Sequence, residues 1–159
     1  MTYSPQLFEP QTFFDMTQRF RDGRDTPRAY LERCLAVIAD REPVVKAWAV
    51  LNPSGAREAA DASTERYRRG HPISLIDGMP IGIKDLIETK DMPTGHGCAA
   101  FAGNETRRDS AIVRALRDAG AVILGKTVTT EMGGAFPGPT TNPFDPGAHR
   151  GVHPAARPR

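Results

Sequence analysis

The sequence predicts an α/β fold, in which helices flank part of a mixed sheet. Helical and strand-like patterns alternate along the chain, and residues 109–127 combine a helix, a glycine and a buried strand in direct succession. A helical connection of this kind is what places two strands side by side in parallel. The short apolar run from Gly78 to Asp85 is expected to be a further strand, which ends in two charged residues.

The N-terminal part predicts two helices. Residues 11–21 carry large apolar residues with roughly helical spacing, namely Phe13, Phe14, Met16 and Phe20. A second helix is expected to start at Asp25-Thr26-Pro27, because a capping side chain stands before a proline, which loses no hydrogen bond in a first turn. Its apolar face is Tyr30, Leu31, Cys34, Leu35 and Ile38. Glu42-Pro43 is expected to end it, since a proline disfavours helical backbone in the residue before it.

A strand and a third helix are expected next. Residues 44–51 are rich in branched and aromatic side chains, which favour a strand. Residues 52–55 predict a turn, and a polar, alanine-rich helix is expected to follow as far as about Arg69. Residues 70–77 are interpreted as a loop.

The second half predicts two short buried strands joined by a helix. The first strand lies within Gly78–Asp85 and ends in two charged residues. After a loop at 95–106, Asp109 is expected to cap the helix, and Gly120 stands where a glycine commonly ends one. The apolar face of this helix is Ile112, Val113, Leu116 and Ala119. Ala121–Leu124 is then expected to be a buried strand, closed by a polar turn at 125–127.

The overall composition argues against several classes of protein. Hydrophobic residues make up 39% and charged residues 25%, and the net charge is +2 from 21 basic and 19 acidic residues. This balance gives no reason to expect a nucleic-acid or membrane partner. No apolar run approaches the roughly 20 residues of a membrane helix, and the N-terminus lacks a secretory signal pattern. Two cysteines, Cys34 and Cys98, make no disulfide framework, so a cytoplasmic location is expected.

Residues Gly120–Thr127 also match the phosphate-binding loop pattern of two glycines, a lysine and a threonine. A real phosphate loop follows a strand, whereas here a helix precedes Gly120 and the residues between the glycines are apolar. A nucleotide-binding module at this segment is kept as an alternative function, and a non-catalytic interaction fragment as another. His149 and His153 stand four apart, as two metal ligands on a helix would. Glycines and a proline around them disfavour a helix, which argues against a metal site there. No metal or organic cofactor is expected.

Lys84 is the candidate catalytic residue. It follows a buried strand, and the carboxyl ends of such strands form the active edge of α/β sheets. Burial disfavours the charged form of an amine, and a neutral lysine can accept the proton of a serine hydroxyl. The simpler interpretation is an exposed lysine paired with Asp85.

Several ordered motifs resemble the amidase signature family. Residues 77–85, Asp-Gly-Met-Pro-Ile-Gly-Ile-Lys-Asp, are similar to its lysine motif, and 109–127 are similar to the helix, strand and Gly-Lys-Thr turn that follow it. Thr130-Glu131 and residues 142–146 continue the similarity. The resemblance implies an incomplete amidase signature fold and an amidase that hydrolyses carboxylic amide C–N bonds in small-molecule substrates without a cofactor. It also implies a Ser–cisSer–Lys triad, in which Lys84 is the lysine.

The similarity predicts two parts of the chain. Residues 1–146 are expected to be the N-terminal part of an amidase signature domain, and 147–159 an aberrant tail. Members continue into a run such as Thr-Pro-Gly-Gly-Ser-Ser, which leads to the two serines and the oxyanion loop, and this chain does not. Residues 152–159 can be encoded by the synonymous codons GTA CAC CCG GCG GCT CGT CCC CGC. From the third base, this choice of codons reads as Thr-Pro-Gly-Gly-Ser-Ser. We therefore expect a shifted reading frame near 147–152, and expect the 159-residue chain by itself to be inactive.

Overall fold

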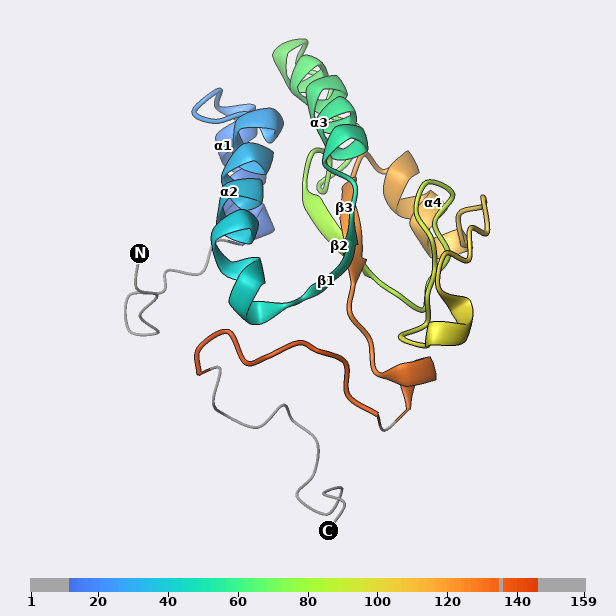
Figure 1. Cartoon of the computed structure of the whole chain (residues 1–159). Helices are drawn as coiled ribbons and strands as arrows, with labels where there is room; N and C mark the ends of the chain where they lie inside the picture. Colours follow the sequence, from blue (N-terminus) through green and yellow to red (C-terminus); the bar gives the residue numbers. More distant parts are fainter. Residues whose placement is uncertain (1–11, 135, 146–159) are drawn as a thin grey trace.

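The structure is a computed structural model, and it describes residues 12–134 and 136–145 (Figure 1). The expected tail at 147–159 lies outside these residues. The helices are α1 (Phe13–Arg21), α2 (Pro27–Val45), α3 (Pro53–Arg68) and α4 (Ala111–Asp118). The strands are β1 (Trp48–Leu51), β2 (Pro80–Lys84) and β3 (Val122–Thr127). Two short 3-10 helices are η2 (Ala99–Phe101) and η3 (Glu131–Gly133).

The three strands form a mixed sheet in the order β1-β3-β2, which confirms the predicted α/β class. β2 pairs in parallel with β3 and places Lys84 opposite Thr127, while β1 pairs with β3 in the antiparallel sense. The connection from β2 to β3 passes through α4, as a parallel pair requires. The prediction of a buried strand is also confirmed, because residues 121–124 are all at most 4% exposed.

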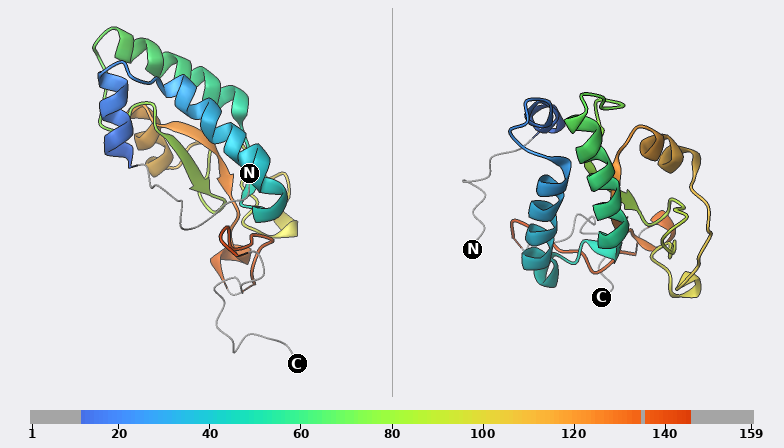
Figure 2. Two further views of the ribbon diagram at one scale, coloured as in Figure 1. Left: turned by 90° about the vertical axis from the view of Figure 1, so that its left-hand side faces the viewer. Right: turned by 90° about the horizontal axis from the view of Figure 1, so that it is seen from above.

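Helices cover both faces of the central strand. Val122 and Leu124 pack with Leu31 of α2 and two alanines of α3, so these helices lie side by side on one face (Figure 2). Ile123 points the other way and packs with Val113 of α4. Successive side chains of a strand alternate between the two faces, so the apolar run is buried from both sides. α4 therefore lies across the sheet from α2 (Figure 1).

The end of α2 differs from the prediction. The helix continues through Pro43 to Val45 and ends where Lys46 takes a left-handed backbone, with φ of 52°. Pro43 is tolerated because it stands in the last turn, where it removes a single helical hydrogen bond. The Glu42 carboxylate accepts hydrogen bonds from the backbone N–H groups of Ala47 and Trp48, which directs the chain into β1. The strand expected at 44–51 is therefore confined to Trp48–Leu51.

Two helix starts differ from the prediction by a few residues. The turn expected at 52–55 is the first turn of α3, where the Asn52 side chain accepts from the Gly55 N–H at 3.1 Å. Ser110, not Asp109, caps α4. The Asp109 carboxylate instead accepts from the Lys90 N–H at 2.9 Å and pairs with Arg117. Ile112, expected on the buried face of α4, is 57% exposed.

Asp77 ties α3 to the loop before β2. Its fully buried carboxylate accepts hydrogen bonds from the Arg66 guanidinium, from the Ser63 hydroxyl at 2.8 Å and from the Ile73 N–H at 3.0 Å. Burial alone would raise the pKa of Asp77, but these donors outweigh it, so its pKa lies below the ordinary value for an aspartate. The start of the predicted lysine motif is thus held by a saturated carboxylate.

Residues 136–145 return to the end of α2. The Thr141 N–H and hydroxyl donate to the carbonyl oxygens of Val45 and Val44, each at 2.8 Å, and the Thr140 hydroxyl donates to that of Lys46. Arg41 donates to the Pro143 carbonyl at 2.7 Å. The last carbonyl groups of a helix lack partners within it, so this segment supplies donors to the end of α2.

Candidate active site

Lys84 is the last residue of β2 and lies at the edge of the sheet where both parallel strands end. Its predicted position at the end of a short strand is confirmed. Its side chain is exposed, however, so the expected burial is wrong within the described residues. Among these residues, none forms a hydrogen bond or an ion pair with the Lys84 amine.

The simpler interpretation supposed that Asp85 pairs with Lys84. The structure shows no such pair among the described residues. The strand alternates at its end, so that Ile83 and Asp85 are buried and Lys84 between them is exposed. The Asp85 carboxylate accepts from the Gly95 N–H at 3.1 and 3.2 Å, and it pairs with Lys126 at 3.1 Å. Its backbone N–H donates to the Thr127 carbonyl, and its carbonyl accepts from the His96 N–H. Asp85 therefore joins β2, β3 and the loop at 93–96.

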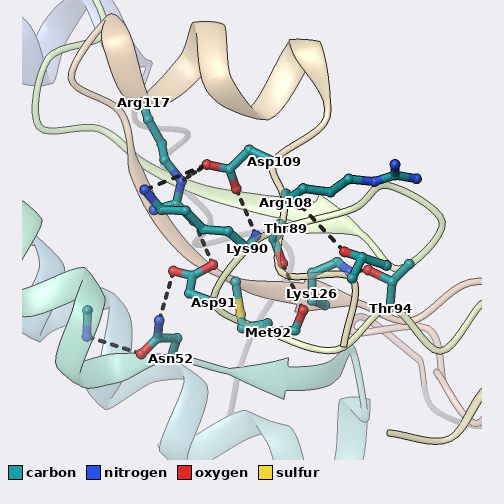
Figure 3. A network of polar contacts seen from close by, with 12 residues as sticks. Asn52, Thr89, Lys90, Asp91, Met92, Thr94, Arg108, Asp109, Arg117 and Lys126 are labelled. Carbon is teal, nitrogen blue, oxygen red and sulfur yellow. Dashed lines mark hydrogen bonds and ion pairs between the residues drawn. The ribbon is translucent and has the colours of Figure 1, made fainter. Parts of the chain in front are cut away.

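Lys126 is the buried lysine of this structure. Its side chain is 0% exposed, and its ammonium has three acceptors: Asp85 Oδ1, Thr94 Oγ1 at 2.8 Å and the Pro93 carbonyl at 3.1 Å. Figure 3 shows Lys126 beside Thr94. Three acceptors satisfy the three N–H bonds of an ammonium group. The prediction of a polar turn at 125–127 is wrong, because these residues continue β3. The apolar run before Lys126 was a signal that the strand continues into the core. A lysine buried there needs a partner of opposite charge.

Two loops with unusual backbone conformations meet beside this edge. His96 and Met132 have positive φ angles of 54° and 49°, and the Met132 N–H donates to the His96 carbonyl at 2.8 Å. Residues with a side chain seldom adopt this conformation, and such residues cluster at functional sites. Nearby in sequence, the buried Thr129 hydroxyl has no hydrogen-bond partner among the described residues. The loops after β2 and β3 are therefore tightly constrained around the end of the sheet.

The nucleotide-binding alternative conflicts with this geometry. Gly120 follows α4 with φ of 86°, and residues 122–127 form the central strand rather than an open loop. A phosphate cradle needs free backbone N–H groups, whereas those of a central strand are used in the sheet. The Lys126 ammonium is enclosed by its own partners. The prediction of a helix end followed by a buried strand is confirmed, and the phosphate-loop interpretation of this segment is wrong.

A second polar network lies between α4 and the loop at 88–91. Arg117 pairs with Asp91 at 2.7 Å and with Asp109 at 3.2 Å, and Asp91 also accepts from the Asn52 side chain (Figure 3). A surface hollow of about 440 Å³ borders this network, lined by Lys90, Arg107, Arg108, Asp109, Arg114, Arg117 and Asp118. Its arginines are paired with carboxylates, so its charge is locally balanced. Within the described ranges, no group of three or more metal-binding side chains occurs, and no helix is long and apolar enough to cross a membrane.

Comparison with known proteins decides the family. The family model described as Amidase matches residues 29–152, which includes the lysine motif, β3 and the segment between them. The chain belongs to the amidase family.

The relatives of this amidase-family chain carry several names. It is 40% identical over 144 residues to a glutamyl-tRNA(Gln) amidotransferase component of Chloroflexus aggregans, covering 84% of the chain and 30% of the relative. It is 41% identical over 144 residues to the putative amidase AmiD of Mycobacterium tuberculosis, covering 87% of the chain and 30% of the relative. The chain therefore spans about a third of the length of these curated relatives.

Solved structures agree with the fold. A crystal structure of an amidase superposes with a TM-score of 0.76 and 34% identity, covering 86% of the chain and 32% of that structure. The native peptide amidase of Stenotrophomonas maltophilia superposes with a TM-score of 0.73 and 31% identity, covering 80% and 26%. The three-stranded sheet and its helices thus correspond to one part of a larger amidase fold.

Proposed function

We propose that this amidase-family protein hydrolyses carboxylic amide C–N bonds, and that Lys84 is the lysine of its Ser–cisSer–Lys triad. The observation that carries the proposal is the place of Lys84, at the carboxyl end of a parallel strand and within the motif at 77–85. Its amine is exposed at the edge of the sheet, where further residues of an amidase fold have access to it. Family membership and the similarity to solved amidases support the reaction class.

The geometry suits Lys84 to a proton-accepting role. A general base must reach the proton that it takes, and its amine must not be engaged elsewhere. The neighbouring carboxylate of Asp85 is directed inward and occupied by Lys126, which leaves the Lys84 amine without a described partner. In the proposed mechanism, Lys84 accepts a proton through the second serine while the nucleophilic serine attacks the amide carbonyl. Both serines and the oxyanion donors come from residues other than 12–145.

The proposal includes the inactivity of residues 1–159 on their own. Removing one oxyanion donor lowers rates by about 10²–10³-fold, and removing the nucleophile removes nearly all of a triad's contribution. A chain that contributes only the lysine is therefore expected to stay near the uncatalysed rate. The substrate is proposed to be a small-molecule amide, in a cytoplasmic protein. The names of the relatives include a glutamyl-tRNA(Gln) amidotransferase subunit and a peptide amidase, so they point to no single amide substrate.

A chimeric enzyme tests the assignment of Lys84. Residues 12–145 replace the matching segment of the Stenotrophomonas maltophilia peptide amidase, and hydrolysis of a peptide amide is measured. Lys84→Met should lower kcat/KM by about 10³-fold or more, because it removes the proton acceptor. Lys90→Met is the matched control: Lys90 is also exposed and only weakly paired, at 3.9 Å from Asp109, so kcat/KM should stay within about twofold.

Circular dichroism establishes that each chimera is folded. A folded chimera that keeps its activity after Lys84→Met would refute the role of Lys84. A folded chimera that hydrolyses no amide with Lys84 intact would count against the proposed reaction.

A further inference from the structure

We propose that Asp85 and Lys126 are positioning residues that act through Lys84, by forming a neutral ion pair behind it that leaves its amine free to release a proton. This inference rests on the proposed function of Lys84. Asp85 and Lys126 are themselves buried and do not reach the exposed edge. Their proposed effect on the reaction is therefore indirect and electrostatic.

The ion pair is built from two strands and one loop. Asp85 directly follows Lys84, and the register of the sheet places Ile83 opposite Lys126. Lys126 therefore projects from β3 at the level where β2 ends, and its ammonium meets Asp85 at 3.1 Å. Thr94 and the Pro93 carbonyl complete its coordination, and the Gly95 N–H completes that of Asp85. With this set of partners, both charges are satisfied inside the fold.

The charge balance has a direct consequence for Lys84. A carboxylate close to a lysine stabilises the ammonium form and opposes loss of its proton, whereas a nearby cation favours the neutral amine. Asp85 is adjacent to Lys84 in the chain, so an uncompensated carboxylate there would hold the proton on Lys84. Lys126 cancels that charge at short range and keeps the carboxylate on the opposite side of the strand. Lys84 thereby combines an exposed position with the absence of a competing anion.

Other charged groups near the Asp85–Lys126 pair have partners of their own. The Glu88 carboxylate, in the turn after β2, is paired with Arg108 through two hydrogen bonds of 2.8 and 2.9 Å. Arg108 is the main reason that the pKa of Glu88 lies below its ordinary value, with smaller effects of His96 and Lys126. The His96 ring packs edge-on against Phe101 with centroids 5.0 Å apart. On β3, the residue opposite Lys84 is the uncharged Thr127.

Titration of Lys84 in the 159-residue chain tests the proposal. The chain has four lysines, so ¹³C-labelled lysine gives four Cε signals that Lys→Arg variants assign. Asp85→Asn leaves the Lys126 charge uncompensated and should lower the titration midpoint of Lys84. Lys126→Met leaves the carboxylate uncompensated and should raise the midpoint. The double variant should return to the wild-type midpoint, while Lys46 and Lys90 should not move.

Opposite shifts are the signature that a merely structural role would not produce. A loosened sheet would move Lys84 in the same direction in both single variants, and this result would overturn the proposal. The proposal would also be overturned if the titration midpoint of Lys84 in the double variant differed from wild type as much as it does in either single variant. If Lys126→Met does not fold, judged by Trp48 fluorescence, Asp85→Asn decides, and an unchanged or raised midpoint refutes the idea. Because the measurement needs no amide hydrolysis, its failure is distinct from failure of the chimeric enzyme.

Discussion

Replacing Asp77 by alanine should destabilise the fold more than any loss of a surface ion pair. The substitution leaves the Arg66 guanidinium, the Ser63 hydroxyl and the Ile73 N–H without their shared acceptor. Removing one partner of a buried ion pair costs about 3–5 kcal/mol. The Arg66 side chain is 29% exposed and regains some hydration, so we expect a loss near the lower end, about 3 kcal/mol.

Urea unfolding followed by Trp48 fluorescence measures this loss, since Trp48 is the single tryptophan of the chain. With a slope of about 1–3 kcal/mol per molar urea, a loss of about 3 kcal/mol lowers the midpoint by about 1–3 M. Asp61→Ala is the matched control, because Asp61 pairs with Arg28 at the surface with its side chain 57% exposed. A surface pair contributes about 0–1 kcal/mol. Equal shifts for Asp77→Ala and Asp61→Ala would refute the reasoning.

Three further predictions concern the same fold. Because the pKa of Asp77 is lowered in the folded state, its contribution to stability is complete above the unfolded-state pKa of about 3.9 and is lost as pH falls through the folded-state pKa. The urea concentration at the midpoint should therefore decrease when the pH is lowered below about 4, and it should decrease less in Asp77→Asn. Gly120→Ala should destabilise more than Gly70→Ala in the same assay: both have positive φ, but a Cβ at Gly120 would collide with the Asp77 carboxylate, whereas nothing lies within 4 Å of one at Gly70. Calorimetric titration with millimolar ATP should show no binding that depends on Lys126, since its ammonium is enclosed; micromolar binding abolished by Lys126→Ala would contradict the assignment of β3.

Local patterns predicted the parts of the fold that depend on local physics. The apolar run at 121–124 could only be a strand buried on both faces, and Gly120 was recognisable as a helix end. Thr26 was predicted as a cap because the side chain, the following proline and the apolar face agree. Lys84 was placed at a strand end for the same reason, since a run of apolar residues stops at a charge.

Features that depend on distant partners could not be predicted in this way. Pro43 was expected to end α2, but the Glu42 carboxylate and the threonines at 140–141 stabilise two further helical residues. Lys126 is buried and Lys84 is exposed. This difference depends on how β2 pairs with β3, and no local pattern in the sequence contains that pairing. Lys84 is exposed because side chains alternate along the strand, and its neighbours Ile83 and Asp85 are the buried ones.

The return of residues 136–145 to α2 has a consequence for the order in which the chain folds. The donors that complete the end of α2 come from 94 to 97 positions later in the sequence, and the Arg41 contact spans 102. Contacts of such long separation form late, because a large loop must close first. Thr140 and Thr141 follow β3 in the sequence, so the segment that supplies donors to the last turn of α2 is synthesised after the central strand.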